Sequence, residues 1–354
     1  MPKVYEARGA CATAARGVGW PRMYDFISIG DSTLDVFLGI HEASVSCQIN
    51  KEQCLLCLEY AEKIPVDTVT KIPGAGNASN AAVGASRLGL RSAIVSVLGK
   101  DEIGQEIMQG WRKEKVATPY VTFDAKHDTN YSTVLVFKGE RTILTHSAPR
   151  KYALPRIDGA KWVYYTALGP GHERMEKQLL EHLKKNPHQK LCFNPGTRHL
   201  RRGLKAIKPV IRRSEVFIVN KEEAERLLED GQKPIHYLLL NLHKLGPKIV
   251  VITDGPNGSH ATDGSHIWSL GIFEGPTIER TGAGDSYATA FVAALHHGHP
   301  ISEAMRWGTA NSWSVVQSIG PRKGLLDRAK MKTALRKFAR VKTRSEQVML
   351  EHQA

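Results

Sequence analysis

The sequence is poor in cysteine, in long apolar runs and in acidic residues, and each shortage argues against a class of protein. Cysteine is scarce: five residues among 354 do not make a disulfide scaffold, so we expect a reducing, cytoplasmic environment. No stretch approaches the roughly 20 apolar residues that a membrane helix needs, so we expect no membrane partner. Residues 1–22 lack the apolar centre of a signal peptide and show no periodicity. We interpret them as a disordered extension, with an Arg-containing transit peptide as the alternative.

Acidic residues are outnumbered, since 49 Lys and Arg face 35 Asp and Glu, for a formal charge of +14. The excess is clustered, with net charges of +3 over residues 1–22, +7 over 198–213 and +7 over 322–354, so the remainder is slightly acidic. A clustered basic balance suits contact with nucleic acid, and equally an enzyme that handles phosphates. No zinc-finger, RNA-binding-sheet or helix-turn-helix signature accompanies it, so we do not expect a nucleic acid partner.

Alternating strand and helix patterns fill most of the chain. The expected strands of the main sheet are residues 24–30, 92–98, 162–168, 190–197, 215–220 and 248–255. Helical patterns lie between them, and repeated β-α units imply a mostly parallel sheet with helices on both faces. We therefore predict an α/β domain over residues 23–345, followed by a tail at 346–354.

Two segments interrupt this alternation and predict a second, smaller sheet. Residues 130–146 form two strand patterns joined by Lys138-Gly139-Glu140, which is a hairpin signal. Together with residues 37–72, this hairpin is predicted to form a lid over the ligand edge of the main sheet. Arg141, in the hairpin, is either a substrate contact or a solvated side chain.

The lid segment contains three of the five cysteines, Cys47, Cys54 and Cys57. Cys54 and Cys57 have the spacing of metal ligands, and His41 could add to them, but no second pair follows at the distance that a zinc site needs. We predict free cysteines here and assign no metal ligand anywhere in the chain.

The stretch Glu279-Arg280-Thr281-Gly282-Ala283-Gly284-Asp285 organises the chemistry. Its small residues let backbone approach a ligand closely, and a helical pattern follows directly. The N-terminus of that helix would offer unpaired N–H groups to an anion, most often a phosphate. Asp285 beside it is placed to take a proton from a hydroxyl that attacks the phosphate. The alternative is a tight turn in which Asp285 only caps the helix.

Polar residues also gather where strands end, which is where α/β sheets bind ligands. Asp31 and Asp35 are expected in the loop after the first strand, and Asn194, Asn220 and Thr253 follow later strands. Residues 73–83, PGAGNASNAAV, form a Gly-rich turn leading into a helix of small residues, from which Asn77 or Asn80 can face a ligand.

The order of these motifs resembles the ribokinase-like carbohydrate kinases of the PfkB type. The resemblance covers about residues 24–340 and rests on PGAGNASNAAVGASRLGL, on Asn220-x-x-Glu223 and on TGAGDSYATAF. It implies a ribokinase-like fold, which is a mostly parallel central sheet with helices on both faces plus a small β lid. It also implies ATP-dependent transfer of phosphate to a hydroxymethyl group of a sugar.

The resemblance assigns roles to individual residues. Asp285 would be the base, and the N–H groups of Gly282, Ala283 and Gly284 would form the anion hole. The positions implied for the substrate are Asp31, Asp35, Gly76 and Asn80. The positions implied for ATP and Mg²⁺ are Asn220, Glu223, Thr253, Gly255, Gly258 and Asn311.

Two departures from the family pattern stand beside these matches. The family's Asp-Thr before the second motif is here Glu279-Arg280, which leaves dependence on a monovalent cation such as potassium open. The Gly-Gly that opens the first motif is here Ala75-Gly76, which narrows the space beside the substrate.

The substrate is not decided by these motifs, because the fold serves sugars, nucleosides and sugar phosphates. A free sugar is our leading expectation. A phosphosugar would need basic side chains such as Arg141 or Arg198, and a nucleoside would need stacking from Tyr131 or Phe37. The remaining alternative is a non-catalytic basic binding protein on the same fold. Because exposed small sheets tend to find partners, we also expect that two lids can pair in a homodimer.

Overall fold

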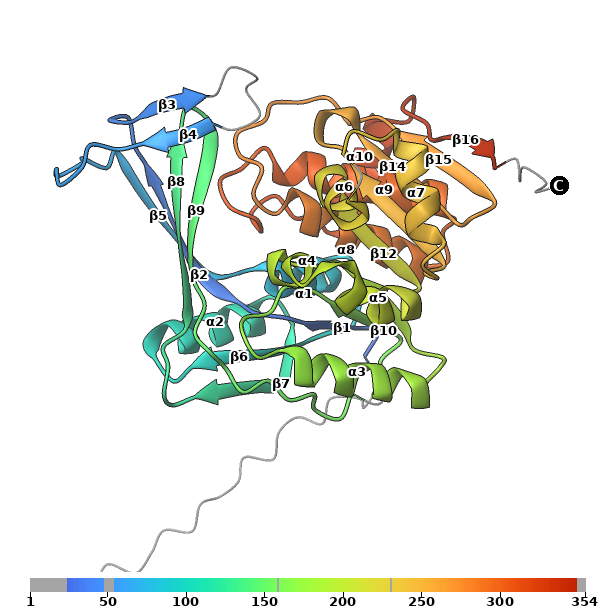
Figure 1. Ribbon diagram of the computed structural model, residues 1–354, viewed down its shortest axis with the longest axis horizontal. Coiled ribbons are helices and arrows are strands. Elements are labelled where there is room, and N and C mark those ends of the chain that lie inside the picture. The colour runs from blue at the N-terminus through green and yellow to red at the C-terminus, as the bar shows by residue number, and fades with distance from the viewer. Residues whose placement is uncertain (1–23, 48–53, 158, 230, 349–354) are drawn as a thin grey trace, which may run out of the picture.

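A computed structural model describes residues 24–47, 54–157, 159–229 and 231–348 (Figure 1). The predicted extension at residues 1–22 lies outside these ranges. The apolar runs of the sequence form a ten-stranded sheet in the order β16-β15-β14-β13-β12-β11-β10-β1-β6-β7. Its strands are β1 (Phe26–Ile29), β6 (Ser92–Gly99), β7 (Ala117–Asp124), β10 (Trp162–Tyr165), β11 (Lys190–Phe193), β12 (Val216–Asn220), β13 (Ile249–Thr253), β14 (Ser259–Thr262), β15 (His266–Leu270) and β16 (Arg344–Gln347).

Within this sheet, the neighbouring strands β7, β6, β1, β10, β11, β12 and β13 pair in parallel. The strands β14, β15 and β16 continue the sheet in antiparallel pairing. This confirms the predicted α/β fold with a mostly parallel sheet. The β14–β15 hairpin and β16 were not predicted. The predicted domain end at residue 345 falls inside β16, which pairs with β15.

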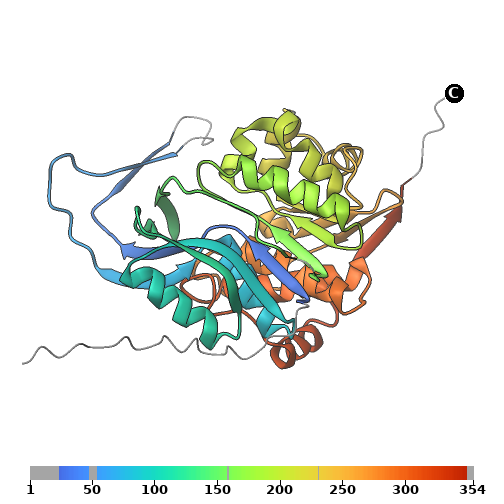
Figure 2. The same cartoon turned by 90° about the horizontal axis from the view of Figure 1, so that it is seen from below.

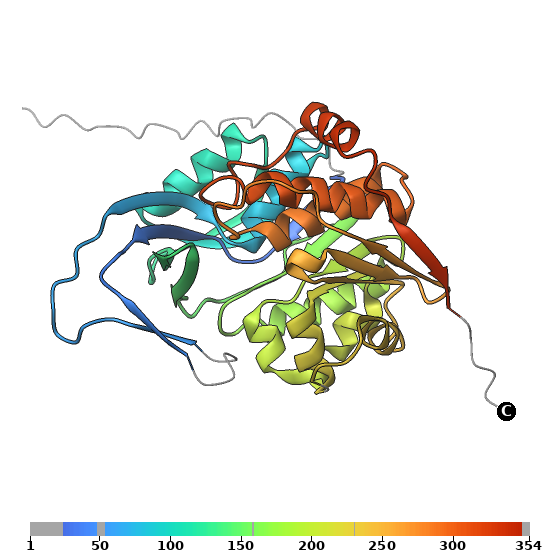
Figure 3. The ribbon, with the colours of Figure 1, turned by 90° about the horizontal axis from the view of Figure 1, so that it is seen from above.

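Helices cover both faces of the sheet, as Figures 2 and 3 show from opposite sides. One face packs against α3 (Glu173–Lys185), α5 (Gly203–Arg213), α6 (Lys221–Leu228) and α7 (Ile235–His243). The other packs against α1 (Asn77–Arg87), α2 (Glu102–Lys113), α8 (Ala283–His296), α9 (Ile301–Val315) and α10 (Arg328–Lys337). A short helix, α4 (Thr197–Arg201), and a 3₁₀ turn (Gly255–Asn257) follow β11 and β13. Among the described residues, no helix is both long and apolar enough to span a bilayer.

The small residues of α1 and α8 let these two helices pack closely. Every residue from Ala78 to Ala85 is buried, as is every residue from Asp285 to Ala294. A Cβ added to Gly84 would lie 3.1 Å from the Thr289 side chain of α8, so the helices meet at a distance that larger residues would increase. This contact brings the two Gly-rich motifs, about 200 residues apart in sequence, to one place.

The lid is a second sheet in the order β5-β2-β8-β9, formed by β5 (Thr68–Ala75), β2 (Thr33–Gly39), β8 (Asn130–Phe137) and β9 (Glu140–His146). It rises from the main body and carries the β3–β4 hairpin (Ser44–Cys47 and Cys54–Cys57) at its far end (Figure 1). The predicted second sheet is therefore present. Asp35 lies within β2 and not in a loop, which corrects our prediction.

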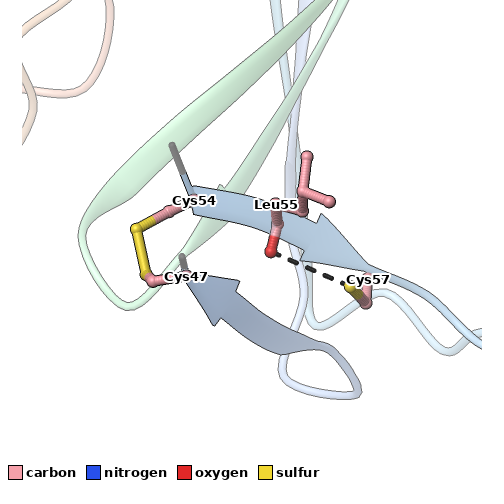
Figure 4. Close-up of a disulfide and its surroundings, with 4 residues drawn as sticks. All are labelled: Cys47, Cys54, Leu55 and Cys57. Atoms are coloured by element: carbon pink, nitrogen blue, oxygen red, sulfur yellow. Dashed lines mark hydrogen bonds between the residues drawn. A yellow bond between two sulfur atoms is a disulfide. The ribbon is translucent and has the colours of Figure 1, made fainter. Parts of the chain in front are cut away.

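Cys47 and Cys54 form a disulfide across the β3–β4 pair (Figure 4). The prediction of free cysteines was therefore wrong for these two. Their places opposite each other in the hairpin bring the Cα atoms to 4.0 Å. Cys54 and Cys57, although close in sequence, lie three residues apart in a strand and so point to opposite faces. Cys57 remains a free, exposed thiol.

Candidate active site

The turn before α8 is built by Gly282, whose backbone is left-handed with φ of 79°. A Cβ at this position would lie 2.3 Å from Pro321, so both the conformation and the space require glycine. The N–H of Ala283 donates to the carbonyl of Arg280 at 3.2 Å. Of the three N–H groups assigned to an anion hole, that of Ala283 is thus already used by the turn. Those of Gly282 and Gly284 have no backbone partner within the described part of the chain.

Asp285 lies in the first turn of α8 and is only 8% exposed. Asn80 of α1 donates its amide to the Asp285 carboxylate at 2.8 Å. The pKa of Asp285 is raised to about 6, mainly by burial and also by the charge of Asp35, against the opposing effect of hydrogen bonds from Asn80 and Asn77. A carboxylate with a pKa near 6 is ionised at neutral pH and is a stronger base than an ordinary aspartate.

Asn80 is bonded to Asp285, and Asp35 lies near enough for its charge to act on that carboxyl group. Thr33 donates to Asp35 at 2.5 Å, and burial is the largest cause of the raised pKa of Asp35. Gly76 has φ of 97°, and a Cβ there would lie 2.9 Å from the Asp31 carbonyl, so backbone passes backbone closely. The Oδ1 atom of Asn80 is buried and has no hydrogen-bond partner. It is therefore an acceptor in need of a donor, such as a hydroxyl.

Asp31 sits at the carboxyl end of β1, but its carboxylate is held by the protein. The Tyr152 hydroxyl donates to both of its oxygens at 2.9 and 2.8 Å, and the Gly169 N–H donates to one at 2.7 Å. Burial raises the pKa of Asp31 to about 6. These bonds tie the β1 loop to the β10 loop, so Asp31 positions the loop that precedes Asp35.

Glu279, the residue that departs from the family pattern, joins three segments. Its carboxylate accepts from Thr281 N–H at 2.5 Å and from Gly320 N–H at 3.3 Å. The guanidinium of Arg141, in the lid, lies 3.5 Å from the same carboxylate. Arg141 therefore forms an ion pair with Glu279 within the protein. The lid is therefore linked directly to the loop that begins α8.

Arg322 is a further cation on this side, which the sequence did not reveal. It donates to the Pro73 carbonyl, and its charge lowers the pKa of Asp35 against the effect of burial. No motif surrounds Arg322, and only the fold brings it to the turn before α1. Arg198, by contrast, belongs to α4, the short helix that follows β11.

A cavity of about 320 Å³ adjoins the N-terminus of α8. Five of the predicted residues line it, namely Thr253, Gly255, Gly258, Ala283 and Gly284. The rest of the lining was not assigned from the sequence, and much of it comes from the segment after β15 and from α9, including Phe273 and Trp313. Asn311 does not line it. Its side chain donates to the Ser286 carbonyl at 2.9 Å and accepts from Leu326 N–H at 2.9 Å, so it holds α9 between α8 and the chain before α10.

Asn220 and Glu223 form a reciprocal cap at the start of α6. The Asn220 side chain accepts from Glu223 N–H at 2.8 Å, and the Glu223 carboxylate accepts from Asn220 N–H at 2.9 Å. The pKa of Glu223 is raised, mainly by burial and also by the charge of Asp285. The cap thus fixes one oxygen of Glu223 and leaves its negative charge near that of Asp285.

A second polar cluster lies away from this cavity. His172, Glu176 and His199 have ligand-type atoms within 4.8 Å of one another. Arg202 donates to both Glu176 oxygens at 2.9 Å and to His172 Nε2 at 3.1 Å, so a guanidinium takes the place that a metal ion would need. The Gly196 N–H donates to His199 Nδ1 at 3.1 Å. Since these atoms have partners, we assign the cluster to the packing of α3, α4 and α5.

The site as a whole joins a buried base, a helix N-terminus with free N–H groups and a neighbouring cavity. Such an arrangement defines a phosphoryl transferase of the α/β class. Residues 38–328 match the pfkB family of carbohydrate kinases, so the chain belongs to this family and is a phosphotransferase that acts on a sugar hydroxyl.

Individual relatives differ in what they phosphorylate. An ATP-dependent 6-phosphofructokinase of Thermoanaerobacterium thermosaccharolyticum is 22% identical over 84% of this chain and 90% of its own. The ribokinase of Arabidopsis thaliana, solved with ribose and ATP, has a TM-score of 0.72 at 19% identity and covers 88% of this chain and 99% of its own. A nucleoside kinase of Methanocaldococcus jannaschii has a TM-score of 0.71 at 19% identity, covering 88% and 98%. These two structures confirm the ribokinase-like fold.

Proposed function

We propose that this kinase transfers the γ-phosphoryl group of ATP to the hydroxymethyl group of a free, uncharged sugar. The observation that carries the proposal is the pairing of Asp285 with Asn80. The amide of Asn80 holds the Asp285 carboxylate at 2.8 Å, while its buried Oδ1 lacks a donor. A sugar hydroxyl next to the reacting one meets this need by donating to Oδ1, which leaves the attacking hydroxyl to donate its own proton to Asp285.

Each residue has a separate part in this mechanism. Asp285 takes the proton of the attacking hydroxyl, and Asp35 and Asn80 bind neighbouring hydroxyls and so orient it. The N–H groups of Gly282 and Gly284 stabilise negative charge on the transferred group, together with the positive end of α8. The lid lowers the access of water, which would otherwise accept the phosphoryl group.

A divalent cation, which we take to be Mg²⁺, fits the acidic residues at the nucleotide side. The negative charge of Asp285 raises the pKa of Glu223, and a cation bound beside Glu223 would relieve this repulsion. Because Mg²⁺ is usually bound through one or two carboxylates plus substrate phosphates, we expect Glu223 to help hold it, with Asn220 fixing Glu223. When bound, the ion would neutralise phosphate charge.

The charges on the substrate side favour an uncharged acceptor. Arg141 is already paired with Glu279, and Arg322 is near Asp35. Neither cation is left without a nearby carboxylate, so a substrate phosphate would find little net attraction. This supports a free sugar over a phosphosugar.

The lid also offers little for a nucleoside base. Phe37 is 3% exposed and belongs to the core of the lid, which leaves Tyr131, 36% exposed, as the available ring of the two. Stacking on a base needs an open aromatic face. We therefore keep adenosine as a test substrate and not as a second proposal.

The first experiment is an assay of ADP release from Mg-ATP with ribose, fructose, other free sugars, fructose 6-phosphate and adenosine. We expect turnover with a free sugar. Turnover with fructose 6-phosphate alone would contradict the charge argument, and turnover with adenosine alone would make the protein a nucleoside kinase. ATP binding without any turnover would favour the basic binding protein.

We propose in addition that two lids pair in a homodimer. Exposed apolar side chains are concentrated on the lid strands and the adjoining segment, namely Val45, Leu55, Leu58, Tyr60, Val66, Val69, Ile143 and Leu144. A surface of this kind is costly to leave in water. Sedimentation of the wild type should give twice the monomer mass. The double variant Val69→Asp, Leu144→Asp should sediment with the monomer mass, whereas a wild-type monomer would refute the dimer.

We also propose a cytoplasmic location, on the low cysteine content. The Cys47–Cys54 disulfide is the feature that opposes it. Alkylation of thiols at lysis, followed by mass spectrometry, should find both cysteines reduced in cells. A fully oxidised pair would contradict this location.

A further inference from the structure

The nucleotide cavity has an unusual charge distribution. Of the described residues that line it, Arg280 is the single one with an ionised side chain. The others are glycines, residues with hydroxyl groups and apolar or aromatic residues, and no carboxylate is among them. A nucleotide carries its negative charge on its phosphates, so the place of Arg280 within this lining is informative.

Arg280 is next to the phosphate-binding turn in sequence and in space. Its carbonyl accepts the N–H of Ala283 at 3.2 Å, which closes the turn that starts α8. Both Ala283 and Gly284 line the cavity together with Arg280. The guanidinium is therefore carried by the same turn whose N–H groups face the transferred phosphoryl group in the proposed mechanism.

The side chain of Arg280 is also free to bind a ligand. The residue is exposed, and no ion pair or side-chain hydrogen bond involves it within the described ranges. The adjacent carboxylate of Glu279 does not neutralise it, because Glu279 is bound to Thr281 N–H and Gly320 N–H and is paired with Arg141. The loop thus carries a carboxylate that is paired with the lid, Glu279, next to an unpaired cation that lines the cavity, Arg280.

We propose that Arg280 binds the phosphate chain of the nucleotide and is a specificity residue for di- and triphosphates. The inference rests on the proposed kinase function, since it places the nucleotide in this cavity. A guanidinium suits the task because its planar donors can bind two phosphate oxygens at once. The threonine that the family pattern has at this position could supply a hydroxyl but no charge.

The test compares the binding of four ligands, namely Mg-ATP, Mg-ADP, AMP and adenosine, by titration calorimetry without an acceptor sugar. Arg280→Ala should weaken ATP and ADP binding roughly tenfold or more, since charge-assisted hydrogen bonds are lost. It should leave adenosine binding unchanged, because the apolar lining remains. Arg280→Lys should recover part of the loss, and Arg280→Thr should resemble Arg280→Ala.

The matched control is Arg340→Ala, which removes an exposed arginine that does not line the cavity. This variant should bind all four ligands as the wild type does. Equal ATP affinity in wild type and Arg280→Ala would overturn the proposal, as would an equal loss of ATP and adenosine, which indicates a damaged fold.

The two proposals fail in different ways. If the wild type binds none of the four ligands, the kinase function and the role of Arg280 are both wrong. If the wild type binds ATP and the Arg280 variants bind it with the same affinity, the kinase function stands and only the role of Arg280 is wrong.

Discussion

The two halves of the active site hold charge in opposite ways. Among the described residues, those that line the nucleotide cavity offer backbone, hydroxyls and apolar rings, with one unpaired cation, Arg280. The substrate half is rich in charges, but there the protein's own groups neutralise one another. Arg141 is paired with Glu279, and Arg322 lies near Asp35. Asp285 lies at the boundary between the two halves.

This difference shows what each half is suited to receive. An uncompensated cation and free N–H groups favour a ligand that brings negative charge of its own. Paired charges leave hydrogen-bond donors and acceptors but little net field, which suits a polyhydroxylated neutral molecule.

Asp285→Asn should have the largest effect. Loss of the base should lower kcat by about 10²–10⁴-fold, because general-base catalysis contributes on that scale. ATP affinity should be retained, since asparagine preserves the shape of the first turn of α8. The control Glu106→Gln removes an exposed carboxylate of α2 and should leave kcat unchanged. A near-normal rate in Asp285→Asn would remove the base from the mechanism.

The pH dependence should reveal the same carboxyl group. Since the base must be ionised, kcat/KM should rise with pH up to the pKa of about 6 and then level off. The folded-state pKa lies above the ordinary value, so the folded chain binds this proton more tightly than the unfolded chain does. This contribution to stability is present below the unfolded-state pKa of 3.8 and is lost as the pH rises through about 6.

Thermal unfolding of Asp285→Asn isolates that contribution. The variant carries no buried charge at position 285, so it should melt at a higher temperature than the wild type near pH 8 and lose this advantage near pH 4. The wild type and the variant must be compared at each pH, because burial also raises the pKa of Asp31 to about 6 and Asp31 is present in both proteins. A melting difference that does not change with pH would assign the raised pKa to another group.

Arg141→Ala should have a smaller effect, confined to the substrate half. Because the Arg141–Glu279 pair is partly exposed, its loss should cost about 1 kcal/mol, or roughly a fivefold rise in KM for the sugar. ATP hydrolysis without sugar should increase as the lid loosens, while ATP affinity stays the same. Arg141→Lys should restore most of the loss. Lys138→Ala, at the turn of the same hairpin, is the control and should change neither value.

Much of this picture was predictable from local pattern. The parallel strands, α1 and α8 follow from apolar runs and glycine positions, which are properties of neighbouring residues. The β14–β15 hairpin and β16 escaped because they are short and lie at the edge of the sheet. Their pairing depends on the strands beside them, which no local pattern contains.

The side chains of the site were predictable only in part. Asp35, Asn80 and Asp285 belong to motifs, and the structure brings them together. Asn311 was assigned to the nucleotide, yet its amide is consumed by the Ser286 carbonyl and by Leu326 N–H. That outcome is set by contacts between distant segments, and the same holds for Arg322, which donates to the Pro73 carbonyl.

The most direct test of the central claim is the structure of the product. The sugar that gives the highest rate in the ADP-release assay is converted by the wild type, and the product is analysed by mass spectrometry and phosphorus NMR. We predict one phosphate per molecule, on the hydroxymethyl oxygen, and at least about 10²-fold less product from Asp285→Asn in the same time. A bisphosphate, or inorganic phosphate released in step with ADP, would contradict transfer to a neutral sugar at Asp285.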